Sequence, residues 1–396
     1  MKDGGESQRV DDRQKSIPGV RPQECQKVCE NESRQDDRLV KFFDICVPVE
    51  TCNLRCHYCY ITQKRLFAKS LPKFCHAPQE FAKALSTERL GGICMLNFCG
   101  GGETLLPPEM PAYVEAALSA GHYVMVVTNG TVGSAFEQLS KLPKEYLERL
   151  FFKFSYHFLE LRGRNLTDKF FTHVKMMRDA GASFTVEATP TDELVPYIEE
   201  MKGETMEEVG AWCHLTVPRS EKDMSRIPLM TKMSPEEFYE TWKVFDSALF
   251  EYKFSVFGKK TKNFCYAGKW SYLLDMSSGM LMQCYGGCGI QNLYENIDQP
   301  LRTVAIGHFC RMPHCYNSHA FHTFGDLPAV AAPSHAILRN RVCADGTEWL
   351  KPRMKRFMMQ NMGENNSHYS LPVKMLADAY VPLYAAGRIA KRLIGK

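Results

Sequence analysis

Three cysteines stand close together near the start of the chain, in the segment Cys52-Asn-Leu-Arg-Cys56-His-Tyr-Cys59. Three thiolates on one loop can hold three irons of a cubane cluster and leave the fourth iron open. An open iron can bind a small cofactor and pass an electron to it. Zinc sites usually combine paired C-x2-C units that supply four ligands, whereas this loop offers three. The spacing therefore favours a [4Fe–4S] cluster over a zinc site or a set of unrelated thiols.

A glycine-rich turn, Gly100-Gly101-Gly102-Glu103-Thr104, follows roughly forty residues later. It comes directly after the apolar run 93–98, which predicts a strand. Glycines at the end of a strand let the backbone approach a ligand closely, and a carboxylate at that place can pair with an ammonium group. Alone, such a segment is more often only a turn. Its place after the three-cysteine loop makes it a candidate binding site.

Together, the two motifs resemble the signature of the radical S-adenosylmethionine (SAM) superfamily. The resemblance implies that Cys52, Cys56 and Cys59 bind a [4Fe–4S] cluster whose open iron is chelated by SAM. It further implies that the Gly-Gly-Glu motif binds the amino group of the methionine moiety of SAM. Thr104 replaces the proline that is more usual in this motif. The remaining cofactor positions that the resemblance implies are Tyr58, Gly101, Gly102, Glu103, Asn129, Ser155 and Glu187.

The alternation of apolar and amphipathic segments predicts α/β architecture for residues 38–220, with a parallel sheet covered by helices. Six strands are expected at residues 42–47, 95–99, 123–128, 151–155, 184–188 and 213–217. Helices are expected at 79–90, 109–120, 133–139, 168–180 and 192–201. Six such units resemble the partial (β/α)6 barrel of radical SAM enzymes. Ligands of parallel α/β folds bind at the carboxyl ends of the strands, and both motifs fall at such ends.

A second cysteine set surrounds a predicted β-hairpin. Apolar runs at 272–276 and 280–284 flank a turn that contains Gly279. The arrangement resembles the one-cluster "twitch" version of the auxiliary (SPASM-like) domains that follow many radical SAM barrels. This resemblance predicts a second [4Fe–4S] cluster, with Cys288 or Cys343 as possible substitutes among its ligands. A zinc knot or core thiols are the alternatives. The expected ligands are Cys265, Cys284, Cys310 and Cys315.

The predicted order of segments completes the organisation. Residues 1–37 form a polar arm that contains Cys25 and Cys29, and residues 221–263 form a helical bridge that begins at the N-cap Ser234. The auxiliary domain spans 264–325, and a C-terminal tail spans 326–396. The tail ends in a basic amphipathic helix from about residue 380. We expect that helix to pack on the protein, and membrane attachment is the weaker alternative.

Composition limits the possible partners and the compartment. The chain has 396 residues, 44% hydrophobic and 24% charged, with a net charge of +4. So small a net charge gives no reason to expect nucleic acid or a membrane as partner. No apolar stretch is long enough to span a bilayer, and the N-terminus has no apolar signal core. Sixteen cysteines in such a chain indicate metal ligands and reduced thiols in a cytoplasmic protein.

The resemblance implies that reductive cleavage of SAM yields a 5′-deoxyadenosyl radical, which abstracts a hydrogen atom from the substrate. An auxiliary cluster that accepts the second electron would make the reaction an oxidation of a sugar, a cyclitol or a peptide. The alternative is redox-neutral epimerisation, with Cys288 or Cys343 as hydrogen donor. In either case the expected electron donor is a flavodoxin or a ferredoxin. A hypothesis of another class is an Fe–S electron carrier or redox sensor, which would need no SAM site.

Overall fold

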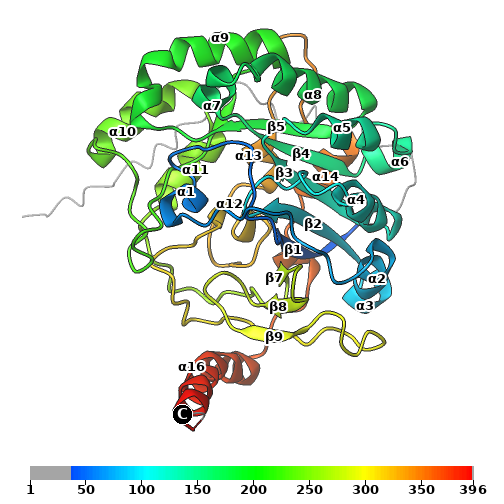
Figure 1. Ribbon diagram of the computed structural model, residues 1–396. Coiled ribbons are helices and arrows are strands. Elements are labelled where there is room, and N and C mark those ends of the chain that lie inside the picture. Colours follow the sequence, from blue (N-terminus) through cyan, green and yellow to red (C-terminus); the bar gives the residue numbers. More distant parts are fainter. Residues whose placement is uncertain (1–36, 395–396) are drawn as a thin grey trace, which may run out of the picture. The chain divides into compact units, whose positions relative to one another are not determined.

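One nine-stranded sheet organises the computed structural model, which describes residues 37–394 (Figure 1). The strand order is β6-β5-β4-β3-β2-β1-β7-β8-β9. Neighbours from β6 to β7 are parallel, and β8 and β9 continue the sheet in antiparallel fashion. The strands are β1 Leu39–Val47, β2 Ile93–Gly100, β3 Tyr123–Thr128, β4 Leu150–Ser155, β5 Ser183–Ala188, β6 His214–Leu215, β7 Ser271–Asp275, β8 Met280–Met282 and β9 Gly289–Asn292.

Helices connect the parallel strands and cover the outer face of the sheet. The helices as far as β5 are α1 Tyr60–Lys64, α2 Pro78–Ala84, α3 Thr87–Leu90, α4 Met110–Ser119, α5 Gly133–Leu139, α6 Lys144–Leu147, α7 Phe158–Gly163 and α8 Thr167–Ala180. Between β5 and β7 lie η1 Asp192–Tyr197, α9 Ile198–Val209, α10 Pro235–Trp242, η2 Lys243–Phe245 and α11 Ala248–Val256.

Five further helices follow the last strand: α12 Ser318–Phe321, α13 His335–Arg339, α14 Pro352–Met358, α15 Met362–Asn365 and α16 Leu371–Ile394. The segment from α12 to α15 covers the inner face of the sheet. Phe42 of β1 stacks there on Phe324, with ring centroids 5.1 Å apart, and Tyr123 of β3 stacks on Phe357 at 3.6 Å. The chain therefore closes the amino-terminal half of the inner face with its own C-terminal segments.

Two hydrophobic cores result because successive side chains of a strand point to opposite faces. Phe43 and Ile45 of β1 belong to the core that packs against the outer helices. Phe42 belongs to the core beneath the C-terminal segments. Strands that are apolar on both faces are typical of parallel sheets covered on both sides, which explains the long apolar runs in the sequence.

The predicted partial (β/α)6 barrel is confirmed as an open parallel sheet, since each of the six predicted strands is present. The hairpin is also present as β7 and β8, but β7 pairs with β1 and extends the same sheet. The helix predicted at 79–90 is interrupted between Ala84 and Thr87. Ser234 caps α10 with a capping box to Glu237, as predicted.

The predicted segment boundaries stay predictions. Strand β7, which belongs to the predicted auxiliary domain, pairs with β1 of the predicted barrel in one sheet. Within residues 37–394, every helix is too short or too polar to cross a bilayer. The prediction for the N-terminal arm, with Cys25 and Cys29, lies outside the described residues.

Candidate functional site

The three-cysteine loop and the glycine-rich turn are in direct contact at the carboxyl ends of β1 and β2. The backbone N–H of Gly102 donates to the Val49 carbonyl, and the N–H of Glu103 donates to the Thr51 carbonyl at 3.1 Å. A Cβ atom on Gly102 would overlap the Thr51 carbonyl oxygen. Glycine is therefore required at this position, because the segment after β1 that leads into the cysteine loop passes against its backbone.

Glu103 fixes this turn to the end of β3. Its carboxylate is buried, with 2% of the residue exposed. Oε1 accepts from the Thr128 hydroxyl at 2.6 Å and from the N–H of Leu105 at 3.0 Å, and Oε2 accepts from the N–H of Asn129 at 2.7 Å. Burial raises its pKa, and these hydrogen bonds oppose the increase. A carboxylate has about four acceptor positions, so room for one further donor remains.

Asn129 connects β3 to the cysteine loop. Its side-chain N–H2 group donates to the Asn53 side chain at 2.8 Å and lies 3.8 Å from the Cys52 sulfur. Asn53 in turn donates to the Thr131 hydroxyl at 2.7 Å, which donates to the Asn129 side-chain oxygen at 2.7 Å. These side-chain bonds hold the loop against the same edge of the sheet. Asn129 thus has a structural role beside the predicted cofactor contact.

The three thiols of the loop are partly or fully buried and lie close enough to influence one another. Burial, and then the charges of Glu103 and Cys59, raise the pKa of Cys52 to about 11. Burial likewise raises the pKa of Cys56, with further contributions from Glu160, Cys59 and Cys52. Such thiols stay protonated at neutral pH unless a metal replaces their protons. This donor set fits an iron–sulfur cluster.

Tyr58, next to Cys59, is held by a neighbour from β4. Its hydroxyl lies 2.6 Å from Nδ1 of His157, immediately beyond the end of that strand. Burial, and then the charge of Lys153, lower the pKa of His157 to about 4, so its imidazole is neutral. His157 is therefore a hydrogen-bonded neighbour of the loop. Ser155 lies at the carboxyl end of the same strand and is half-buried.

The inner face of the sheet carries a polar layer directly below this edge. Asp44 of β1 is opposite Asn97 of β2 in the register, and its Oδ1 accepts from the Asn97 amide at 2.7 Å. Oδ2 accepts from the hydroxyl of Tyr285 at 2.7 Å and from the amide of Asn317 at 2.8 Å. Burial raises the pKa of Asp44. The layer thus connects the barrel to the two segments that carry the second cysteine set.

Lys153 and Glu187 continue this layer on β4 and β5. The Lys153 ammonium is 3.3 Å from the Glu187 carboxylate, which also forms an ion pair with Arg339 of α13. Burial, and then the Arg339 guanidinium, lower the pKa of Lys153. Burial also lowers the pKa of Arg339, to about 9. Glu187 thus pairs with two cations, and its predicted contact with the cofactor stays a prediction.

Sequence reasoning missed Asp44, Asn97, Lys153 and Arg339. The first three are polar residues within apolar strands, and the alternation of side chains places all three on the same face of the sheet. This pattern could have predicted a polar layer on that face. Arg339 lies 152 residues from its partner Glu187, and nothing in the local sequence points to the pairing.

We expect Arg339→Met to lower the free energy of unfolding by about 3 kcal/mol, because it removes one partner of a buried ion pair. The Lys153 ammonium keeps the loss from being larger. The measurement is urea unfolding of the anaerobic protein. The matched control is Arg162→Met, whose pair with Glu200 is about half exposed and should leave the midpoint near that of wild type. Equal midpoints for the two variants would contradict a stabilising role for the buried pair.

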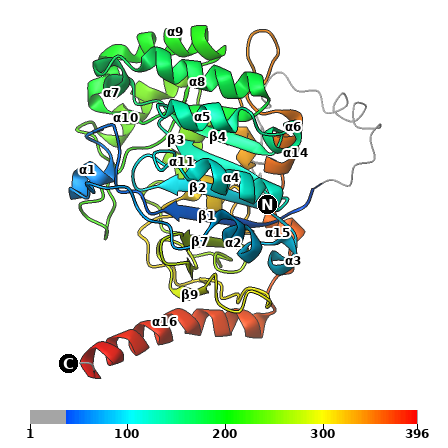
Figure 2. The same ribbon diagram turned by 45° about the vertical axis from the view of Figure 1, so that its right-hand side comes forward.

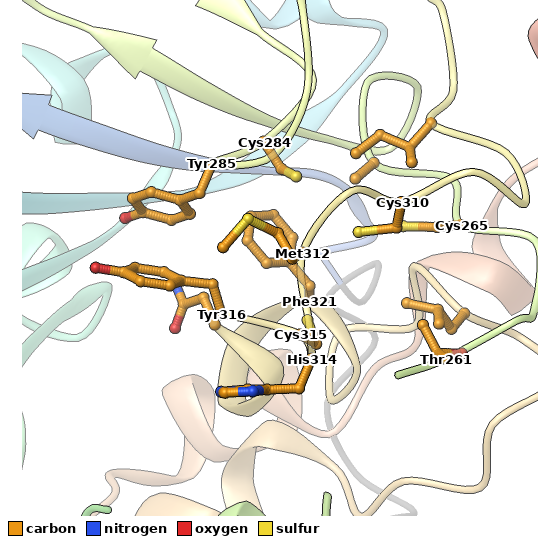
Figure 3. Close-up of a pocket in the computed structure, with 14 residues that line it drawn as sticks. Thr261, Cys265, Cys284, Tyr285, Cys310, Met312, His314, Cys315, Tyr316 and Phe321 are labelled. Atoms are coloured by element: carbon orange, nitrogen blue, oxygen red, sulfur yellow. The ribbon is translucent and has the colours of Figure 1, made fainter. Parts of the chain in front are cut away.

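The second cysteine set lines one cavity, as Figure 3 shows. The cavity lies between the end of β8 and the loop that precedes α12. Burial raises the pKa of Cys284 to about 12, with a further contribution from Cys310. Burial also raises the pKa of Cys265 and Cys315, and the neighbouring thiol of Cys284 adds to the increase. The predicted ligands Cys265, Cys284, Cys310 and Cys315 all line this cavity.

The two substitute thiols lie elsewhere. Cys288 is buried beyond the turn that follows β8, where its backbone pairs with Gln283. The Cys343 sulfur lies 3.4 Å from the carbonyl oxygen of Val209. Val209 is the last residue of α9, the helix that precedes β6. The structure thus brings together the four cysteines predicted as ligands. Cys343 lies near the β6 side of the sheet, whereas the glycine-rich turn follows the central strand β2. Within residues 37–394, no three His, Cys, Asp or Glu side chains gather closely enough to share a single metal ion.

Comparison with known proteins agrees with the two motifs. Residues 46–193 match the family model described as "Radical SAM superfamily". No curated protein matches the chain.

Several solved structures are similar in part. SuiB of Streptococcus suis bound to S-adenosylmethionine is 13% identical, with a TM-score of 0.46, over 66% of this chain and 65% of SuiB. Native anSMEcpe with bound AdoMet is 15% identical, with a TM-score of 0.44, over 64% of this chain and 78% of that protein. BtrN in complex with AdoMet and 2-DOIA is 12% identical, with a TM-score of 0.31, over 66% and 81%. Similarities of this size assign neither substrate nor reaction.

Proposed function

Starting from a chain whose residues 46–193 belong to the radical SAM superfamily, we propose that this enzyme oxidises its substrate with the help of a second, auxiliary iron–sulfur cluster. Cys52, Cys56 and Cys59 hold the first [4Fe–4S] cluster, on which SAM binds. When bound, the cluster and SAM supply a 5′-deoxyadenosyl radical that removes one hydrogen atom from the substrate. Oxidation by two electrons also requires that the substrate lose a second electron and a proton.

The observation that carries the proposal is the direct contact between the two motifs. The Gly102 and Glu103 backbone bonds tie the glycine-rich turn to residues 49–51, which lead into the cysteine loop. Asn129 ties the end of β3 to Asn53 of the same loop. A group held by the loop therefore lies beside the backbone of Gly101 and Gly102 and the last free position of the Glu103 carboxylate. This arrangement supports the binding of an amino-acid moiety next to an open iron.

The second cysteine set supports a route for the second electron. Four thiols that line one apolar cavity are the donor set of a closed [4Fe–4S] cluster. Tyr285, next to Cys284, donates to the Asp44 carboxylate on the inner face of the barrel. This contact ties the end of the hairpin, next to Cys284, to the inner face of the barrel. The second electron would thus leave the substrate toward the auxiliary cluster, and the proton would pass to solvent.

Epimerisation is the less supported alternative, because it needs a thiol that returns a hydrogen atom at the site. Cys343 lies near the β6 side of the sheet, against Val209. Cys288 lies outside the residues that line the cavity. For the substrate class, a saccharide, a cyclitol and a peptide stay open, and a flavodoxin or a ferredoxin remains the proposed electron donor.

Anaerobic turnover with SAM and a reductant tests the proposal. We expect 5′-deoxyadenosine to form and, with candidate saccharides or peptides, a product lighter than its substrate by two hydrogen atoms. A product of unchanged mass that takes up deuterium from solvent would instead establish epimerisation. Protein that binds iron but neither binds nor cleaves SAM would contradict both reactions and indicate an electron carrier or redox sensor.

A further inference from the structure

Helix α16 presents its apolar face outward. Seven exposed residues fall on one side of a helix with 3.6 residues per turn: Leu371, Pro372, Met375, Leu376, Ala379, Pro382 and Leu383. Val373, which is 39% exposed, lies beside this stripe. Four of the seven are large apolar side chains that are 65–72% exposed: Leu371, Met375, Leu376 and Leu383. A helix that simply packs on its own protein buries this kind of face.

The opposite face of α16 holds the helix to the protein through the buried side chain of Ala377 and through polar contacts. Asp378 accepts from the backbone N–H of His308 at 2.8 Å and pairs with its imidazole at 2.9 Å. The Lys374 ammonium lies over the ring of Phe264, 5.2 Å from its centroid. Figure 2 shows α16 running beside β9. The helix is therefore anchored through its polar side, which is the reverse of the packing expected from the sequence.

The sequence continues the same pattern to the end of the helix. Ala386, Ile389, Ala390, Leu393 and Ile394 repeat the spacing of the exposed apolar residues. Residues 371–394 contain four basic residues, Lys374, Arg388, Lys391 and Arg392, and one acidic residue, Asp378. Three of these four basic residues are in the second half of the helix. The segment thus combines a long apolar stripe with a positive flank.

We propose that α16 docks this enzyme onto an anionic phospholipid surface, with the apolar stripe in the interface and the basic residues on the lipid headgroups. An amphipathic helix lying in the membrane plane is recognised by this combination of apolar and basic faces. A second copy of the chain could also cover the stripe, but it would leave the basic residues without an anionic partner, which a phospholipid surface supplies. Membrane attachment, the weaker alternative from sequence, thereby becomes the better explanation of the exposed face.

Flotation of the full-length protein with lipid vesicles tests the proposal. We expect it to float with vesicles that contain about one third phosphatidylglycerol, and to float less in high salt and with phosphatidylcholine alone. The double variant Leu376→Glu/Leu383→Glu should reduce partitioning by at least about a hundredfold, since each change removes a buried leucine side chain from the interface. Iron content and SAM cleavage of this variant should equal those of wild type, because α16 is outside both cysteine sets.

Met359→Glu is the matched control, because Met359 is 58% exposed but lies outside α16. It should float like wild type. Wild-type protein that stays at the bottom of the gradient would overturn the proposal, as would equal flotation of wild type and the double variant. A concentration-dependent dimer that the double variant disperses, without vesicle binding, would assign the stripe to self-association instead. Equal flotation with both vesicle compositions would overturn the assignment to anionic lipid. None of these results depends on whether the proposed oxidation occurs.

Discussion

Replacing Cys52, Cys56 and Cys59 together with alanine is expected to remove about half of the iron and all SAM cleavage. Two clusters amount to about eight irons in the intact protein, and the loop can hold only one of them. The second set, Cys265, Cys284, Cys310 and Cys315, lies in a separate cavity whose lining excludes the loop. Its iron should therefore survive. Without the first cluster there is no open iron for SAM, so 5′-deoxyadenosine should fall to background.

Iron and sulfide analysis of anaerobically reconstituted protein measures the first effect, and chromatography of 5′-deoxyadenosine measures the second. The matched control replaces three cysteines outside both sets, Cys75, Cys94 and Cys213, with alanine. It should keep all of the iron, apart from any loss of stability at the two buried positions, Cys94 and Cys213. A loop variant that retains the full iron content would show that the three-cysteine loop is not a cluster site.

The predicted strands were confirmed. Each of them is buried on both faces of the sheet, and a strand buried on both faces appears in the sequence as a continuous apolar run. The outer face of β1 is apolar at Phe43, Ile45 and Val47, and each further parallel strand repeats such a run. Helix boundaries were confirmed where a local signal marks them, as at Ser234, which caps α10 with Glu237. The helix predicted at 79–90 was wrong in its continuity. Ser86 begins a new helix there, because its hydroxyl accepts from the N–H of Arg89.

The polar layer of the inner face could not be predicted from local sequence. Asp44, Asn97 and Lys153 come together only through the register of four neighbouring strands. Arg339 reaches Glu187 from the C-terminal segments, and such long-range pairing leaves no periodic signal. The orientation of the apolar side of α16 could not be predicted either. Periodicity predicts that one side of the helix is apolar, but it does not say whether that side faces the protein or the solvent.

Replacing Cys284 and Cys310 together with serine is expected to abolish the oxidised product while leaving SAM cleavage detectable. The first cluster and the glycine-rich turn do not use these thiols, so the hydrogen atom should still be removed from the substrate. The electron that completes the oxidation would then lack its acceptor. Because a bound cluster also contributes to folding, circular dichroism of the variant must match that of wild type before the product is compared.

The matched control is the double variant Cys288→Ser/Cys343→Ser, which removes the two thiols that lie outside the cavity. It should keep both clusters and form the oxidised product at a rate near that of wild type. The two double variants thereby separate the proposals for the reaction. Epimerisation with a thiol donor requires the opposite result, in which the control loses product and the cavity variant keeps it. A well-folded Cys284→Ser/Cys310→Ser protein that still forms oxidised product would leave the second cluster, or the zinc knot in its place, with a structural role, and the substrate radical would have to lose its electron by another route.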